Sequence, residues 1–297
     1  MTDEPLFKGV YTALITPFKE DQSVDEEAYV ALINDNIEQG VSGIVPCGTT
    51  GESPTLTPEE QLHLIELAVK TAQGKVPVIA GTGSNSTAKT IEMSQKAEKL
   101  GVSALLVVNP YYNKPTQEGL YLHFKAVAES VSIPIIVYNI KGRTGVNVET
   151  ETLLRLINDC KNIRAVKEAS GDLEQITEVI SQVPKNFSVL SGDDGITLEV
   201  IQKGGHGVIS VASNFIPRKM SMLVHEALTG NMSEATKIQT ELEALFTIEF
   251  IETNPIPIKY MIAKKGKCKE VYRLPLCALH PDNKKKVDAF LETFTSS

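Results

Sequence analysis

Short apolar segments alternate with longer amphipathic segments from the start of the chain to about residue 230. The apolar segments are rich in β-branched residues, as buried strands are, and the segments between them have the spacing of helices. Eight strands are predicted, at Val10–Thr16, Gly43–Pro46, Val78–Ala80, Ala104–Val108, Ile135–Tyr138, Ile163–Lys167, Phe187–Leu190 and Gly207–Val211. Such alternation produces a parallel sheet, either open and doubly wound or closed into a barrel. The count of eight favours an α/β fold of the (β/α)8 TIM-barrel type.

The alternation stops near Leu228, and the remaining sequence has the pattern of helices, including Ser233–Phe250 and Asn283–Phe294. No linker rich in proline, glycine and serine divides the chain. We therefore predict a barrel over residues 1–229, which carries the active site, and an appended C-terminal helical subdomain over residues 230–297.

One helix start is marked clearly by its first residues. Thr57 is an N-cap residue, Pro58 suits the first turn, and Glu59 and Glu60 place carboxylates near the positive end of the helix. We expect this helix to run through Ala68.

Composition excludes several classes of partner. The 297 residues are 42% hydrophobic, enough for one sizeable core, and the net charge of −8 disfavours nucleic-acid binding, which requires a basic face. No apolar run reaches the roughly 20 residues of a spanning helix, and the N-terminus lacks a secretory signal, so we expect a cytoplasmic protein without a membrane partner. The four cysteines lie far apart, which indicates free thiols rather than a zinc site or a disulfide framework.

The predicted strands end in unusually polar residues, and in barrels of this type active residues come from these ends. Lys167 ends a largely apolar strand, where low-dielectric walls disfavour the ammonium form and leave a neutral amine able to attack a carbonyl. A structural ion pair with Glu168 or another carboxylate is the alternative interpretation of Lys167.

Other strand ends offer groups that bind or move charge. The turn from Gly48 to Gly51 has two hydroxyls and accessible backbone N–H groups that suit a small carboxylate, although an ordinary strand–helix turn has the same composition. Tyr112 and Tyr138 are candidates for proton transfer, or are simply packed. Arg143, after a flexible Lys141-Gly142 turn, is either a bidentate carboxylate ligand or a surface arginine.

Three further features are interpreted as structural. Gly81-Thr82-Gly83 lacks the third glycine of a dinucleotide site. Asp193 and Asp194 have no neighbouring histidine and are expected to cap the helix that follows them rather than bind a metal. His206 precedes a strand, which places it on the stability face of a barrel.

The ordered set of motifs resembles the dihydrodipicolinate synthase family, within the N-acetylneuraminate lyase superfamily. The matching motifs cover nearly the whole chain: Thr16-Pro17-Phe18, Gly48-Thr49-Thr50-Gly51-Glu52-Ser53, Asn109-Pro110-Tyr111-Tyr112, Tyr138-Asn139, Gly142-Arg143-Thr144-Gly145, Val166-Lys167-Glu168-Ala169, Ser191-Gly192-Asp193-Asp194, Gly204-Gly205-His206-Gly207 and Asn254-Pro255-Ile256-Pro257. The resemblance implies condensation of pyruvate with L-aspartate-4-semialdehyde through a Lys167 Schiff base, the first step of the diaminopimelate and lysine branch. It implies no metal and no organic cofactor.

The resemblance also implies a role for each matching residue. Thr49, Tyr138 and Tyr112 form a proton relay, with Tyr112 reaching in from a neighbouring subunit. Thr50 holds the pyruvate carboxylate, Arg143 the semialdehyde carboxylate, and Gly192 and Ile209 line the pocket. The family's usual assembly is a homotetramer built as a dimer of dimers.

Two departures from the family pattern affect regulation and the arginine loop. Lys141 stands where the family commonly has proline, two residues before Arg143. Positions that bind feedback lysine in sensitive members carry Lys89, Pro58 and Gln61 here, and the charge of Lys89 would repel the ligand's ammonium group, which predicts weak inhibition. The competing interpretations are another pyruvate-dependent lyase, acting on sialic or 2-keto-3-deoxy sugar acids, and a non-catalytic barrel.

Overall fold

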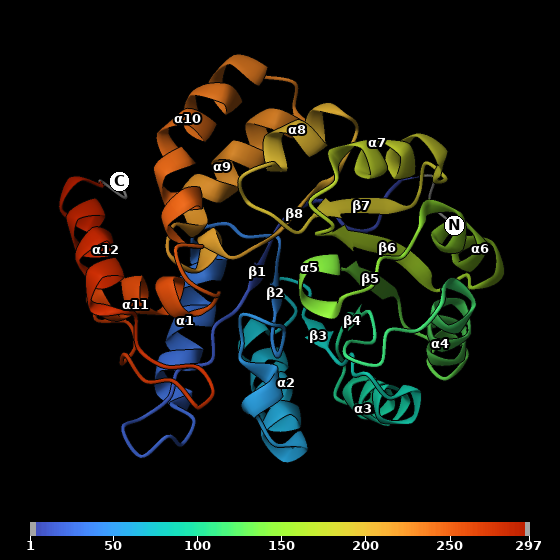
Figure 1. Ribbon diagram of the computed structural model, residues 1–297, viewed down its shortest axis with the longest axis horizontal. Coiled ribbons are helices and arrows are strands. Elements are labelled where there is room, and N and C mark those ends of the chain that lie inside the picture. The colour runs from blue at the N-terminus through green and yellow to red at the C-terminus, as the bar shows by residue number, and fades with distance from the viewer. Residues whose placement is uncertain (1–3, 295–297) are drawn as a thin grey trace.

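The computed structural model describes residues 4–294 and contains eight parallel strands with helices between them (Figure 1). The strands are β1 Gly9–Ala13, β2 Gly43–Val45, β3 Ile79–Gly81, β4 Ala104–Val108, β5 Ile135–Asn139, β6 Ile163–Glu168, β7 Ser188–Ser191 and β8 Gly207–Ser210. They are ordered β2-β1-β8-β7-β6-β5-β4-β3, and a parallel bridge between Ile44 and Val78 brings the two ends of this row together. The predicted TIM barrel is confirmed, and each of the eight predicted strands is present.

Helices follow the strands and surround the barrel. They are α1 Glu26–Glu38, α2 Pro58–Ala72, α3 Thr87–Lys99, α4 Gln117–Glu129, α6 Thr150–Asp159, α7 Leu173–Gln182, α8 Thr197–Gln202 and α9 Pro217–Leu228, with the short helices η1 Ser53–Thr55, α5 Lys141–Thr144 and η2 Ala212–Asn214 in loops. The predicted start of α2 is confirmed: Thr57 Oγ1 accepts from the Glu60 N–H, and the Glu60 carboxylate accepts from the Thr57 N–H. This helix continues past Ala68 to Ala72.

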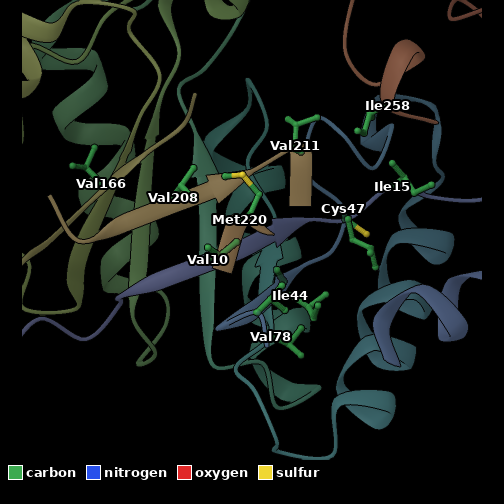
Figure 2. Packing of buried hydrophobic residues seen from close by; sticks show 14 of the residues in the cluster. Val10, Ile15, Ile44, Cys47, Val78, Val166, Val208, Val211, Met220 and Ile258 are labelled. Carbon is green, nitrogen blue, oxygen red and sulfur yellow. The ribbon is translucent and has the colours of Figure 1, made fainter. Parts of the chain in front are cut away.

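Alternation along the strands divides the apolar residues into two layers. Residues such as Val10, Ile44 and Val208 belong to the large core between strands and helices, where Figure 2 shows them packed. A second cluster, which includes Ala165 and Ile209, fills the inside of the barrel. Because side chains alternate along a strand, the two-residue step from Ala165 along β6 directs Lys167 into the barrel and leaves Glu168 on the outer face.

The C-terminal region is helical, as predicted. It contains α10 Met232–Ile248, α11 Ile256–Lys264 and α12 Pro281–Thr293, and α10 lies against α9 (Figure 1). Within residues 4–294, no helix has both the length and the apolar character needed to cross a membrane. All four cysteines are free thiols; Cys47 and Cys160 are buried and Cys277 is exposed.

Candidate active site

The Lys167 amine lies inside the barrel beside an aromatic ring. Lys167 is 5% exposed, and its Nζ lies 4.3 Å from the centroid of the Tyr138 ring. The two residues are partners in the register of β5 and β6. Gly192, just after β7, leaves space for the lysine, since a Cβ there would stand 3.0 Å from Lys167 Cε and 2.6 Å from Ala169 Cβ. Two other predicted site residues, Tyr138 of β5 and Gly192 just after β7, therefore lie beside Lys167.

Lys167 does not pair with its neighbour Glu168. The Glu168 carboxylate accepts from Asn139 Nδ2 at 2.6 Å and from Ser170 Oγ at 2.7 Å. Burial raises the pKa of Glu168 to about 7, against the lowering effect of these two hydrogen bonds. Within the part of the chain that the structure describes, no salt bridge involves Lys167. The interpretation of this lysine as the partner of Glu168 is therefore wrong. No carboxylate holds its amine in a salt bridge within residues 4–294, so the amine is available to react with a carbonyl group.

The loop after β2 carries Thr49 and Thr50 and is closed by its own backbone. The Gly51 N–H donates to the Gly48 carbonyl at 3.2 Å, and Thr16 Oγ1 donates to the Gly51 carbonyl at 2.6 Å. Thr50 is buried, with its Oγ1 accepting from Asn254 Nδ2 at 3.0 Å, whereas Thr49 is partly exposed. The predicted turn is present, and its two hydroxyls occupy different environments.

A fully buried ion pair fastens the same loop to the C-terminal region. Lys259 Nζ, from α11, lies 2.6 Å from Glu52 Oε1, and both side chains have no exposed surface. The same ammonium group lies 4.1 Å from the centroid of the Phe18 ring, a cation–π contact. Sequence reasoning missed this pair. Its signal was a single lysine in the otherwise apolar segment Ile256–Ile262.

Arg143 is exposed and belongs to α5, a four-residue helical turn that includes Lys141 and Gly142. The Gly145 N–H donates to the Lys141 carbonyl at 2.9 Å, and Thr144 Oγ1 donates to the Ile140 carbonyl at 2.8 Å. These bonds order the turn. The guanidinium Nη2 of Arg143 donates to the Asn254 carbonyl at 3.1 Å.

A cavity of about 930 Å³ opens at the ends of strands β2 to β5. Four predicted site residues line it, Thr49, Tyr112, Tyr138 and Arg143, and so do the three residues predicted to weaken lysine binding, Lys89, Pro58 and Gln61. Lys167, Thr50, Gly192 and Ile209 are not among its lining residues; Ile209 is fully buried in the inner cluster that also holds Tyr138.

Tyr112 differs from the other site residues in its exposure. Its side chain is 89% exposed at the rim of the cavity, and its φ of 73° lies in the left-handed region, which is uncommon for a residue other than glycine. Tyr112 is thus the most exposed of the predicted site residues that line the cavity.

The sequence suggested that the two aspartates after β7 cap α8, and this prediction is wrong. Helix α8 begins after Ile196 without a side-chain cap. Buried Asp194 instead accepts from the backbone N–H groups of Val211 and Ala212 at 2.8 and 3.0 Å, and so joins the loops after β7 and β8. The expected structural role of His206 fits its position before β8, where Nδ1 accepts from the Val189 N–H at 3.1 Å.

Comparisons with known proteins agree with this geometry. The model of the dihydrodipicolinate synthetase family matches residues 6–294. The 4-hydroxy-tetrahydrodipicolinate synthase of Chloroherpeton thalassium is 51% identical over 283 residues, which are 95% of this chain and 94% of that protein. The crystal structure of dihydrodipicolinate synthase from Aquifex aeolicus has a TM-score of 0.95 and 47% identity, covering 97% of this chain and 98% of that one. A structure described as the first monomeric dihydrodipicolinate synthase variant has a TM-score of 0.94 and 42% identity, covering 96% of each chain. The chain belongs to the dihydrodipicolinate synthetase family.

Proposed function

We propose that the protein is a lyase that condenses pyruvate with L-aspartate-4-semialdehyde, a 4-hydroxy-tetrahydrodipicolinate synthase. The observation that carries this proposal is the Lys167 amine, buried inside the barrel beside Tyr138 and engaged in no salt bridge within residues 4–294. The relatives' printed name describes the synthesis of 4-hydroxy-tetrahydrodipicolinate. We assign this product to the diaminopimelate and lysine branch of amino-acid biosynthesis.

The reactivity of the Lys167 amine accounts for each step of the condensation. Lys167 attacks the pyruvate ketone and, with loss of water, forms a protonated imine. The cationic nitrogen withdraws electrons, so the methyl group gives up a proton and becomes the carbon of an enamine. That carbon attacks the aldehyde, and the amino group of the semialdehyde then attacks the imine carbon, closes the ring and displaces Lys167. The imine is itself the electron sink, so the reaction needs no metal or organic cofactor.

The remaining site residues move protons and hold the two carboxylates. Thr49, Tyr138 and Tyr112 form the proton relay, for which hydroxyl groups in a chain are suited. Thr50 binds the pyruvate carboxylate, and the exposed guanidinium of Arg143 binds the carboxylate of the semialdehyde as a planar fork. Gly192 and Ile209 complete the wall around the Schiff base, a role supported by the closeness of Gly192 to Lys167.

The outward position of Tyr112 supports a site shared between subunits. The Tyr112 ring is 89% exposed at the rim of the cavity, where a second copy of the chain has access to it. The proposed assembly is a homotetramer, a dimer of dimers. The description of a solved relative as a monomeric variant supports an oligomer as the ordinary state of such proteins. A cytoplasmic location and the division into a barrel, residues 1–229, and a helical subdomain, residues 230–297, belong to the same proposal.

The test is consumption of L-aspartate-4-semialdehyde in the presence of pyruvate, followed by the formation of the cyclic product. Sialic acid and 2-keto-3-deoxy sugar acids serve as alternative substrates in parallel reactions. Condensation of the semialdehyde supports the proposal. Cleavage of a sugar acid without condensation would assign the site to another pyruvate-dependent lyase, and no turnover of any substrate would favour a non-catalytic barrel.

A further inference from the structure

One residue of the C-terminal region contacts both of the residues that are proposed to bind substrate carboxylates. Asn254 lies between α10 and α11 and is 5% exposed. Its side-chain Nδ2 donates to Thr50 Oγ1 at 3.0 Å, and its backbone carbonyl accepts from Arg143 Nη2 at 3.1 Å. These partners are distant in sequence, 204 and 111 residues away. Asn254 therefore joins the loop after β2 to the helix after β5.

The direction of the bond to Thr50 determines what its hydroxyl offers to a ligand. An amide nitrogen only donates, whereas a hydroxyl has one proton and two acceptor positions. When Thr50 Oγ1 accepts from Asn254, the proton of Thr50 stays free to donate elsewhere. A carboxylate only accepts, so this is the state of the hydroxyl that binds one.

The surroundings of Asn254 favour this direction. Its Oδ1 is buried and has no hydrogen-bond partner among the residues that the structure describes. If the Oδ1 and Nδ2 atoms of Asn254 were exchanged, its NH2 group would lack a partner instead. A buried carbonyl without a partner is tolerated more readily than a buried N–H group without one.

The position of Asn254 is fixed by its neighbours. Lys259, in the following helix α11, is held in the buried ion pair with Glu52, which lies two residues after Thr50. The segment that carries Asn254 and the loop that carries Thr50 are therefore joined at two points, the Asn254–Thr50 hydrogen bond and the Lys259–Glu52 ion pair.

We infer that Asn254 is a positioning residue for substrate recognition, which directs the Thr50 proton to the pyruvate carboxylate and holds the Arg143 guanidinium through its carbonyl. This inference rests on the proposed function, since it takes Thr50 and Arg143 as the carboxylate ligands. It also gives the C-terminal helical region a part in the reaction.

The central variant is Asn254→Asp, which keeps the shape of the side chain and replaces its donor with an acceptor. Thr50 would then donate its proton to the new carboxylate and lose it for pyruvate. We expect KM for pyruvate, measured at saturating semialdehyde, to rise by about tenfold or more, the effect of losing a hydrogen bond to a charged group, while kcat changes less. Asn254→Ala, which removes the donor without reversing the bond, raises KM by a smaller factor. If only packing mattered, Asn254→Ala would raise KM for pyruvate more than Asn254→Asp.

Repulsion between the new carboxylate and pyruvate is separated from this effect by a double-mutant cycle with Thr50→Val. If Asn254 acts through the Thr50 hydroxyl, Asn254→Asp has little further effect on KM in the Thr50→Val background. An equal increase in both backgrounds would contradict the inference. Asn36→Asp is the matched control, since Asn36 is a buried asparagine whose side chain, among residues 4–294, bonds only to Thr12 and Leu32.

Each variant is first treated with pyruvate and borohydride to separate the two proposals. Absence of trapping in the unmodified protein would overturn the proposed function and this inference together. Trapping with an unchanged pyruvate KM in Asn254→Asp would overturn only the inference. If Asn254→Asp does not fold, as judged by circular dichroism, Asn254→Ala with and without Thr50→Val supplies the same cycle, and additive effects on KM would contradict the role.

Discussion

The buried pair between Glu52 and Lys259 predicts that removing one partner is far more harmful than removing both. Both side chains are inaccessible to solvent, and their charged atoms lie 2.6 Å apart. Lys259→Met keeps a similar length and apolar stem but leaves the Glu52 carboxylate buried without its counter-charge. Breaking a buried pair in this way lowers the free energy of unfolding by about 3 to 5 kcal/mol.

The prediction is checked by urea unfolding followed by circular dichroism at one protein concentration, because the chain has no tryptophan and assembly affects the midpoint. The matched control is Lys96→Met. Its partner Glu92 is also at 2.6 Å, but the two side chains are 47% and 65% exposed, so we expect a change within about 0.5 kcal/mol.

A double variant, Glu52→Gln with Lys259→Met, distinguishes a stranded charge from lost packing. It removes the uncompensated carboxylate while keeping both side-chain volumes, so it should recover a large part of the lost stability. The reasoning is refuted if Lys259→Met is no less stable than the Lys96→Met control, or if the double variant is as unstable as Lys259→Met alone.

Three further predictions concern pH, specificity and regulation. Burial raises the pKa of Glu168 to about 7 in the folded protein, so the folded state binds the extra proton and loses stability as pH rises from the unfolded pKa of 4.5 to about 7. Glu168→Gln removes this loss. Its free energy of unfolding, measured by urea unfolding, should therefore rise by about 2 to 3 kcal/mol relative to that of the unmodified protein as pH increases from 5 to 8. Parallel pH profiles of the two proteins would contradict this prediction. Arg143→Ala should raise KM for the semialdehyde by about tenfold or more while borohydride trapping with pyruvate is retained, with Arg155→Ala, which loses an exposed pair with Glu118, as the control. Free lysine at sub-millimolar concentration should leave the rate unchanged, because Lys89 lines the cavity beside the site and repels a second ammonium group; inhibition there would reject the charge argument.

The parts of this fold that sequence predicted well depend on local patterns. Strand and helix positions follow from apolar periodicity, and the start of α2 follows from Thr57 and Glu60, only three residues apart. The position of Lys167 at the end of β6 follows from the apolar residues that precede it.

The parts that sequence missed depend on contacts between distant segments. Asp194 was expected to cap the helix that follows it. Its carboxylate instead accepts hydrogen bonds from backbone N–H groups 17 and 18 residues away, after β8. Lys259 and Asn254 meet the loop after β2 across more than two hundred residues, a separation over which a single sequence gives no pairing signal. The sequence indicated a turn at Lys141-Gly142 but not its helical form, in which Thr144 Oγ1 donates to the Ile140 carbonyl.

The most direct test of the account is the mass of the intact protein after reduction by borohydride in the presence of pyruvate, with peptide mapping of the modified residue. The account predicts one pyruvate-derived addition per chain, located on Lys167 and lost in Lys167→Ala, while circular dichroism shows that this variant remains folded. An addition that persists in Lys167→Ala, or no addition to the unmodified protein, would contradict the assignment of Lys167 as the Schiff-base residue.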